Sequence, residues 1–277
     1  GLTLGEFLAG HRFNRYFVEQ YLIPICASVW SAPDVRMLDF PMETFARFFL
    51  NHGLLSVLNQ PQWYVVRGGS HAYVNAFLKT FRGRVFPRTP VTALTRKSGG
   101  ISLKTTEGSE ETFDTVVLAC HADEALRMLA DPSPDERRLL AAWDYSHNRT
   151  VLHHDASFLP PMPKVRASWN YMRMEAVESG SPVMLTYYMT RLQNLATRRQ
   201  YCVTLNRKKP LPDEAGIREI VDNHPSYTPE SQSTQAGMSG MNGLRNTYYC
   251  GSYLGNGFHE DAVKSALTVA RTVGIEL

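Results

Sequence analysis

A glycine-rich stretch, GSYLGNGFHEDAVKSALTVAR at residues 251–271, has the composition of a ligand-holding turn followed by an amphipathic helix. Its glycines, Gly251, Gly255 and Gly257, allow the backbone to approach a ligand closely and to take positive φ. The helix N-terminus would present unpaired N–H groups and the positive end of the helix dipole, which favours negative charge. Acidic residues already occupy the first turn, so a delocalised, partly anionic ring edge suits the site better than a phosphate. A strand–turn–helix junction without a ligand explains the same glycines equally well.

Histidines offer two further candidates. His259, at the expected start of the helix, could contact a ligand or cap the turn, and the sequence leaves both open. The run HHD at 153–155 suggests a metal site. Adjacent residues on a strand point to opposite faces, however, and do not easily bind one ion. We therefore predict no metal site.

Aromatic residues gather on the strands expected to line a cavity. Trp169, Tyr187 and Tyr188 lie in these segments. Aromatic rings suit a cage for an amine and equally suit an acyl chain, and such residues also form the core of aromatic-rich sheets. Trp169 and Tyr188, together with His259, are the candidates for a catalytic role.

The totals predict a globular protein with a sizeable core. The chain has 277 residues, of which 43% are hydrophobic and 20% charged, with a formal net charge of +3. The densest basic runs, at 198–199 and 207–209, lack interleaved aromatic residues, which disfavours nucleic-acid binding. The four cysteines are far apart in apolar runs, which indicates buried thiols in a reducing compartment and no structural zinc. No transmembrane segment or signal peptide is recognisable, so we expect a soluble, cytoplasmic protein.

Hydrophobic periodicity predicts the order of the elements. The first 57 residues read as helices, with an apolar face at steps of four from Phe13 to Val29 and a helix bounded by Asp39 and Gly53. The predicted strands are 63–69, a hairpin around 98–100, a strand at 113–120 of the kind buried in a parallel sheet, antiparallel strands between 149 and 206, and a strand at 247–253. Helices are expected at 70–81, 121–130 and 132–143, with a short helix among polar loops at 211–245 and the last helix after 258.

The chain resembles a known family in many segments that occur in the same order. These are LTLGEFL, ASVWSAP, MLDFP, FFLNHGLL, PQWYVVRGGSHAYV, DTVVLACHADEAL, ASWNYM, RLQNL, CVTLN and the terminal YYCGSYLGNGFHED. It is similar to bacterial NAD/FAD-binding, amine oxidase-like oxidoreductases of the flavin-containing amine oxidase superfamily. The type is associated with cyclopropane fatty-acid synthases. The resemblance extends over essentially the whole chain.

The resemblance implies an α/β fold in which a Rossmann-like FAD domain is interleaved with an α+β substrate domain that has a mixed sheet. Helices at 1–62 and the sheet and helices at 131–240 would belong to the substrate domain. Residues 63–130 and 241–277 would belong to the FAD domain. The implied cofactor-binding residues are Val91, Gly68, Gly69, Gly251, Ser252, Gly255, Gly257, Phe258, His259 and Glu260.

The chain departs from the family pattern at one point. Relatives open with a strand and a GxGxxG turn that binds the pyrophosphate, and no GxGxxG occurs here. The chain also begins with a helix signal and no Met, so we expect an N-terminally truncated sequence with weak or absent FAD binding in isolation.

The implied activity is removal of a hydride equivalent from a substrate C–H bond to flavin. An apolar substrate is favoured, for example a lipid acyl chain, with peripheral contact to the inner membrane and a functional link to a cyclopropane fatty-acid synthase-like methyltransferase. An amine oxidase proper and a non-catalytic lipid- or partner-binding remnant remain alternatives.

Overall fold

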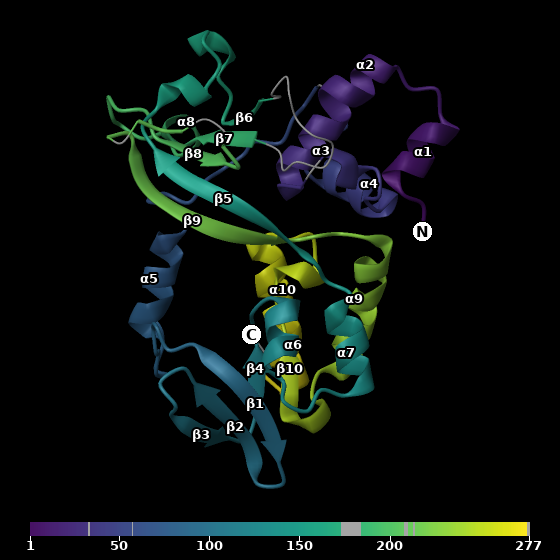
Figure 1. The fold of residues 1–277 in the computed structure, drawn as a ribbon, viewed down its shortest axis with the longest axis vertical. Coiled ribbons are helices and arrows are strands. Elements are labelled where there is room, and N and C mark those ends of the chain that lie inside the picture. The colour runs from purple at the N-terminus through teal and green to yellow at the C-terminus, as the bar shows by residue number, and fades with distance from the viewer. Residues whose placement is uncertain (33, 57, 173–183, 208–209, 213, 276–277) are drawn as a thin grey trace. The chain divides into compact units, whose positions relative to one another are not determined.

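A computed structural model describes residues 1–32, 34–56, 58–172, 184–207, 210–212 and 214–275. The chain forms two compact units, residues 1–83 with 146–224 and residues 84–145 with 225–277 (Figure 1). The divisions fall at other positions than the predicted 62/63, 130/131 and 240/241. The reason is that α7 (Pro134–Ala141) packs against α6 (Ala122–Met128) and α9 (Pro229–Met241), which keeps all three in the second unit.

The first unit opens with short helices. Their bounds are α1 Leu4–Gly10, α2 Arg15–Phe17, α3 Ile23–Trp30, α4 Met42–Asn51 and α5 His71–Thr80. The predicted cap of α1 is confirmed, since Glu6 N donates to Thr3 Oγ1 over 3.1 Å and Thr3 N to Glu6 Oε2 over 2.8 Å. Helix α4 begins after Pro41, so Asp39 is not its cap.

The apolar face predicted between Phe13 and Val29 is interrupted. A π-helical turn, Val18–Leu22, separates α2 from α3 and adds residues to the helical register. Phe13, Phe17 and Tyr21 consequently remain 40–49% exposed, whereas the face of α3 is buried.

The first unit also contains an antiparallel sheet in the order β6-β7-β8-β5-β9. Its strands are β5 Tyr145–His153, β6 Trp169–Met172, β7 Met184–Tyr188, β8 Cys202–Leu205 and β9 Gly216–Pro225, with the short helix α8 (Met189–Leu192) after β7. Four of the strands were predicted. The fifth, β9, was not, because its sequence GIREIVDNHP alternates poorly and it lies at the sheet edge. The strand predicted at 63–69 is absent, since these described residues pair with no strand and only Arg67 and Gly68 lie in a turn.

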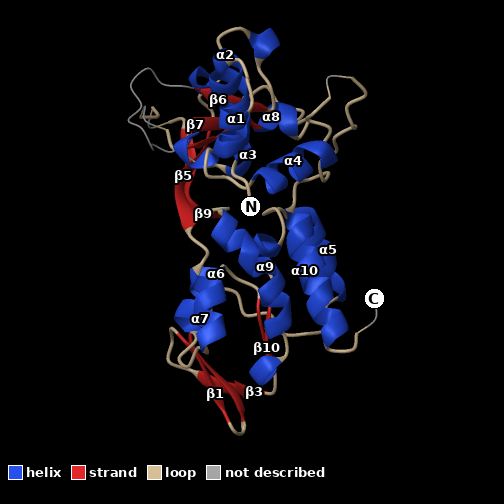
Figure 2. Cartoon of the chain, turned by 90° about the vertical axis from the view of Figure 1, so that its right-hand side faces the viewer, coloured by secondary structure: helices blue, strands red, loops and turns tan. Residues whose placement is uncertain are grey.

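The second unit has two separate sheets, whose strands β1, β3 and β10 are labelled in Figure 2. One is an antiparallel meander of β1 Val91–Lys97, β2 Gly100–Thr105 and β3 Glu110–Phe113, which confirms the predicted hairpin. The other pairs β4 (Val116–Leu118) with β10 (Thr247–Tyr249) in parallel, as predicted, but the predicted burial on both faces is wrong, because Val117 is 46% exposed. The last helix, α10, spans His259–Thr272.

A buried ionic cluster ties these sheets to α7. Arg96 on β1 places both Nη atoms on the Glu136 carboxylate, at 2.5 and 2.9 Å, with side-chain exposures of 4% and 6%. Its Nε also donates to Asp131 Oδ1 over 3.1 Å. Tyr249, the last residue of β10, donates its hydroxyl to Glu136 Oε1 over 2.6 Å. The strand that leads into the glycine-rich turn is therefore fastened at its end to the rest of the unit.

Candidate functional site

The glycine-rich turn at 251–258 follows directly from β10. Tyr249 lies opposite Leu118 in the parallel pair, and Cys250 N donates to Leu118 O over 3.1 Å. The turn therefore lies at the carboxyl end of parallel strands, where ligands bind in open α/β sheets. A short 3₁₀ segment, Ser252–Leu254, shapes the turn before α10 begins.

The three glycines of the turn have different roles. Only Gly257 takes a positive φ, of +94°, so the expectation that all three do so is wrong. A Cβ on Gly251 would lie 2.7 Å from the ring of Tyr253. A Cβ on Gly255 would lie 2.4 Å from Asp261 Oδ1. Gly251 and Gly255 are thus required by close contacts within the turn itself.

Most amides of the turn donate to acceptors of the same segment. Gly255 N and Gly257 N share Ser252 O at 3.0 and 3.1 Å, and Gly251 N donates to Ser265 Oγ over 2.9 Å. Among the described residues, no protein acceptor receives the amides of Ser252, Tyr253 and Asn256. Tyr253 is 2% exposed, so its N–H is shielded from bulk water as well. A buried amide of this kind requires an acceptor from ordered water or from a ligand.

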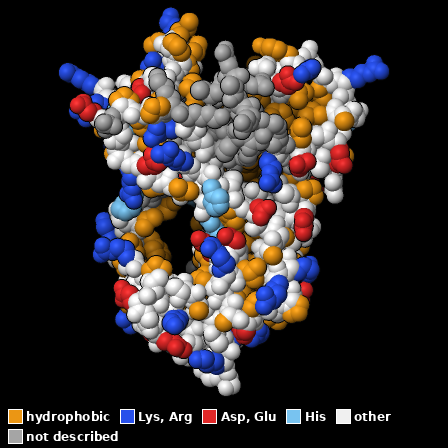
Figure 3. Space-filling view, viewed as in Figure 1, with side chains coloured by type: hydrophobic (Ala, Val, Ile, Leu, Met, Phe, Trp, Pro, Cys, Tyr) orange, Lys and Arg blue, Asp and Glu red, His pale blue; other side chains and the backbone are white. Residues whose placement is uncertain are grey.

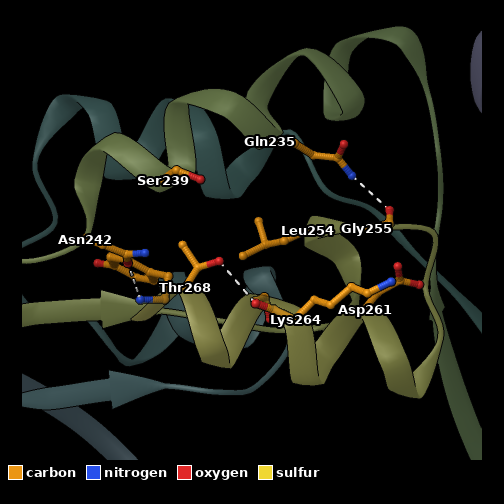
Figure 4. Close-up of a pocket in the computed structure, with 10 residues that line it drawn as sticks. Gln235, Ser239, Asn242, Leu254, Gly255, Asp261, Lys264 and Thr268 are labelled. Atoms are coloured by element: carbon orange, nitrogen blue, oxygen red, sulfur yellow. Dashed lines mark hydrogen bonds between the residues drawn. The ribbon is translucent and has the colours of Figure 1, made fainter. Parts of the chain in front are cut away.

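Helix α9 fixes the other side of the turn. Gln235 donates its side-chain amide to Tyr253 O over 2.9 Å and to Gly255 O over 3.0 Å, and the second contact is drawn in Figure 4. These bonds hold the carbonyls of the turn toward α9. Gln235 is a positioning residue that the sequence did not reveal, because a lone Gln in a polar helix gives no signal.

A cavity of about 210 Å³ lies between α9 and α10 on the Gln235 side (Figure 4). Its walls combine polar side chains such as Ser239, Asp261 and Lys264 with the apolar Leu254. Sites for small organic ligands are usually about 300–1,000 Å³ and mostly apolar. The cavity is therefore smaller than a typical site for an organic ligand, although Leu254 and Gly255 of the turn form part of its wall.

An acidic residue in the first turn of α10 caps the helix, as the sequence predicts. Asp261 Oδ2 accepts the Phe258 amide over 3.0 Å, so this carboxylate is committed to the turn. Glu260 is exposed and lies 3.7 Å from Lys264. His259 is also exposed, at the first position of the helix. Phe258, His259 and Glu260 thus lie beside the turn, and their contact with a cofactor stays a prediction.

The remaining predicted cofactor residues lie elsewhere. Val91 is the first residue of β1, next to a β-bulge, in the same unit as the turn. Gly68 and Gly69 are in the other unit, before α5, with φ of +83° and +79°. A Cβ on Gly69 would meet only the Gln193 side chain, at an ordinary contact distance of 3.8 Å, so space does not require glycine there. The positive φ values explain the choice of glycine instead.

The candidate aromatic residues of the sheet are divided between its faces. Trp169 lies opposite Tyr187, and their rings meet edge to face at 5.6 Å. Tyr188, the next residue, points to the other face and donates its hydroxyl to Gln200. Trp169 and Tyr188 therefore cannot line the same face of one cavity, and Tyr187 is the partner of Trp169. Burial raises the pKa of Tyr187, which keeps it protonated.

The HHD run has structural contacts. His153 is fully buried and shares a hydrogen bond of 2.7 Å with Thr204 Oγ1, which in turn lies 2.8 Å from Thr186 Oγ1. Because Asp155 N donates to Nδ1 of His153 over 3.1 Å, the ring proton lies on Nε2. His154 contacts Gln200 O at 3.2 Å. The two rings lie on different faces of the sheet, as the strand period requires.

Solved structures share this fold over most of the chain. Cyclohexylamine oxidase from Brevibacterium oxydans IH-35A matches with a TM-score of 0.65 and 10% identity over 99% of this chain and 68% of its own. A reduced UDP-galactopyranose mutase matches with a TM-score of 0.64 and 12% identity, over 99% and 68%. A fatty acid isomerase from P. acnes that produces CLA matches with a TM-score of 0.52 and 17% identity, over 75% and 52%. At these identities the likeness shows the fold alone, and the chain spans only about half of the isomerase.

The curated proteins give no match. A family model, flavin containing amine oxidoreductase, matches residues 6–274. This range includes the β4–β10 pair, the glycine-rich turn and α10. The chain belongs to the family of flavin-containing amine oxidoreductases, which use FAD.

Proposed function

We propose that this chain forms the flavin-facing part of an FAD-dependent oxidoreductase that removes a hydride equivalent from a C–H bond of an apolar substrate. The observation that carries the proposal is the set of three turn amides, at Ser252, Tyr253 and Asn256, that have no acceptor among the described residues. They lie at the carboxyl end of a parallel strand pair and before a helix of 14 residues.

The residues of the turn fit a flavin. The carbonyl-rich edge of a flavin ring would offer acceptors for these amides. The positive end of α10 favours the partial negative charge that the edge gains on reduction. Bound flavin would supply the acceptor for the hydride equivalent and pass the electrons on. The protein groups orient the ring, and Gln235 keeps the turn carbonyls away from it.

The pyrophosphate part of FAD needs a unit that these 277 residues do not contain. No GxGxxG occurs in the sequence. The β4–β10 sheet has only two strands in the described part of the chain, although parallel sheets are normally larger and covered on both faces. We propose that a strand–GxGxxG–helix unit extends the β4–β10 sheet and anchors the pyrophosphate.

For the substrate, we propose a lipid acyl chain. The Trp169–Tyr187 pair gives one face of the sheet a rigid aromatic surface. A fatty acid isomerase shares the fold of this chain, and this similarity of fold supports the choice of an acyl chain. The likeness to cyclohexylamine oxidase keeps an amine as the second candidate. The link to a cyclopropane fatty-acid synthase-like methyltransferase rests on the sequence resemblance and belongs to the acyl proposal.

The first experiment measures flavin binding. FAD is added to the 277-residue protein and to the protein joined to a family strand–GxGxxG–helix unit, and flavin fluorescence is followed. We expect weak binding by the first and tight binding by the second. Gly257→Val, which places a side chain at positive φ, should weaken binding, whereas Gly240→Ala, in open space on α9, should not. Tight stoichiometric binding by the 277 residues alone would contradict the missing-anchor proposal.

The second experiment identifies the substrate. The loaded protein is mixed without oxygen with a phospholipid and, separately, with a primary amine, and the visible flavin absorbance is recorded. Loss of absorbance with the phospholipid supports an acyl substrate, and loss with the amine supports an amine oxidase. Stable absorbance with both favours the non-catalytic alternative.

A further inference from the structure

Two connections of the first unit leave the same end of its sheet. Strand β5 ends at His153, opposite Cys202, the first residue of β8. Strand β7 ends at Tyr188, opposite the same Cys202. Residues 154–168, which join β5 to β6, and residues 189–201, which join β7 to β8, therefore lie together at this end.

The first connection forms an anchored, apolar tip. Phe158 and Leu159 are each 2% exposed and hold it to the sheet. A 3₁₀ turn at Pro163–Val165 then leaves Met162 and Val165 60% and 57% exposed. Arg166 Nε donates back to Pro160 O over 2.9 Å, which closes the loop. The tip is thus preorganised with its apolar side chains outward.

The second connection is closed in a similar way. Met189 N donates to Tyr201 O over 2.9 Å, and Tyr201 N to Thr190 Oγ1 over 2.8 Å. Between these anchors Leu195 is 38% exposed. The same connection carries three exposed arginines: Arg191, Arg198 and Arg199.

Charge at this end is strongly one-sided. The two connections together carry five basic residues, Lys164, Arg166, Arg191, Arg198 and Arg199, and one acid, Asp155, whereas the whole chain has 29 basic and 26 acidic residues. Asp155 Oδ1 accepts the Ser157 amide over 2.8 Å. A second acid, Glu214, lies nearby, because its neighbour Ala215 accepts His154 N with its carbonyl oxygen over 2.9 Å. Within the described ranges the five basic side chains form no ion pair. Figure 3 shows hydrophobic atoms at the protruding end of this unit and Lys and Arg side chains near them.

We propose that this end of the sheet, here called the basic tip, docks on the surface of an anionic phospholipid bilayer. Exposed Met and Val side chains can enter the boundary between headgroups and acyl chains, while flanking Lys and Arg side chains reach the lipid phosphates. The exposed apolar residues Met162, Val165 and Leu195 lie on two loops among basic side chains, whereas the centre of a protein interface is depleted in charged residues. No described helix is long and apolar enough to cross a membrane. The basic tip goes beyond the proposed oxidoreductase activity and does not depend on it.

The test is sedimentation of the 277-residue protein with vesicles of phosphatidylcholine alone and with one part in four of phosphatidylglycerol, at low ionic strength. We expect binding only to the anionic vesicles and release by salt. Each Lys or Arg near the surface contributes about fivefold in affinity, so Lys164→Gln, Arg198→Gln and Arg199→Gln together should weaken binding by about a hundredfold. A triple variant with the same charge loss at exposed positions elsewhere, Arg82→Gln, Arg84→Gln and Arg88→Gln, is the matched control.

A second variant separates a bilayer from an acidic macromolecule. Met162→Gln with Val165→Gln keeps every charge and should weaken vesicle binding by at least about tenfold. Circular dichroism checks that each variant keeps its fold. Absence of binding to anionic vesicles, or equal losses in the tip and control triple variants, would overturn the proposal. So would vesicle binding that soluble polyglutamate abolishes and that the Met162 and Val165 changes leave intact, since that pattern indicates an acidic protein.

Discussion

The ionic cluster behind the glycine-rich turn makes a sharp prediction for Glu136→Gln. Burial alone would raise the pKa of Glu136, but hydrogen bonds from Arg96, Tyr249 and Ser133 N outweigh it and lower the pKa to about 2 from the usual 4.5. The side chain is only 6% exposed, so little solvent screening applies. A shift of this size corresponds to about 3 kcal/mol of stability. Loss of one member of a buried ion pair typically costs about 3–5 kcal/mol, which agrees with the value from the pKa shift.

The assay is urea unfolding followed by circular dichroism, at pH 7 and at intervals down to pH 2. Because the folded-state pKa is lowered, the contribution of Glu136 is fully present above pH 4.5 and is lost as the pH falls toward about 2. The free energy of unfolding of Glu136→Gln should therefore lie about 3 kcal/mol below that of the unchanged protein at pH 7. The two should converge as the pH approaches 2.

A neighbouring residue provides the control. Asp135 on the same helix pairs with Arg138, with side-chain exposures of 71% and 66%. Asp135→Asn should change the free energy of unfolding by less than about 1 kcal/mol. If Glu136→Gln cost no more than Asp135→Asn, or if the difference persisted unchanged at pH 2, the cluster would not hold the unit together as argued. Hydrogen exchange at the β10 amides would then show no added loss of protection.

Two further changes test the turn and the sheet. Gly255→Ala should destabilise the turn, because the added Cβ would lie 2.4 Å from Asp261 Oδ1. Gly240→Ala, whose Cβ meets no atom within 4 Å, should be neutral or stabilising. The midpoints of thermal unfolding of both variants measure the difference. Burial lowers the pKa of His153 from 6.5, so the unchanged protein should lose stability as the pH falls below 6.5. In His153→Gln, the free energy of unfolding measured with urea should no longer fall with pH in this range. Equal thermal midpoints for the two Gly→Ala variants, or the same slope in His153→Gln, would contradict these expectations.

The sequence predicted those elements whose signals are local. The hairpin at β1 and β2 follows from alternation around two glycines, and the parallel β4 follows from a short continuous apolar run. The capping box of α1 follows from Thr3 and Glu6. The mixed α/β fold was also confirmed. Its prediction succeeded because these local signals agree with the order of helices and strands that the fold requires.

Elements that depend on distant contacts escaped prediction. Strand β9 is held by pairing with β5, and nothing in its own pattern marks it as a strand. The π-helical turn at Val18–Leu22 shifts a helical face that the sequence shows as continuous. Trp169 and Tyr188 looked equivalent as aromatic residues, and only the strand register separates them onto opposite faces.

The turn illustrates the same distinction within a single motif. Three glycines appeared to serve a ligand, yet two of them accommodate Tyr253 and Asp261. The amides of Ser252, Tyr253 and Asn256, which have no acceptor among the described residues, cannot be recognised from the glycine pattern or the charge. They depend on Gln235, which holds the carbonyls of the turn, and on the Tyr249–Glu136 bond, which fastens the strand before it. If the proposed flavin contact is correct, Gln235→Leu should therefore weaken flavin binding in the protein joined to the GxGxxG unit, although Gln235 itself lies on the opposite side of the turn.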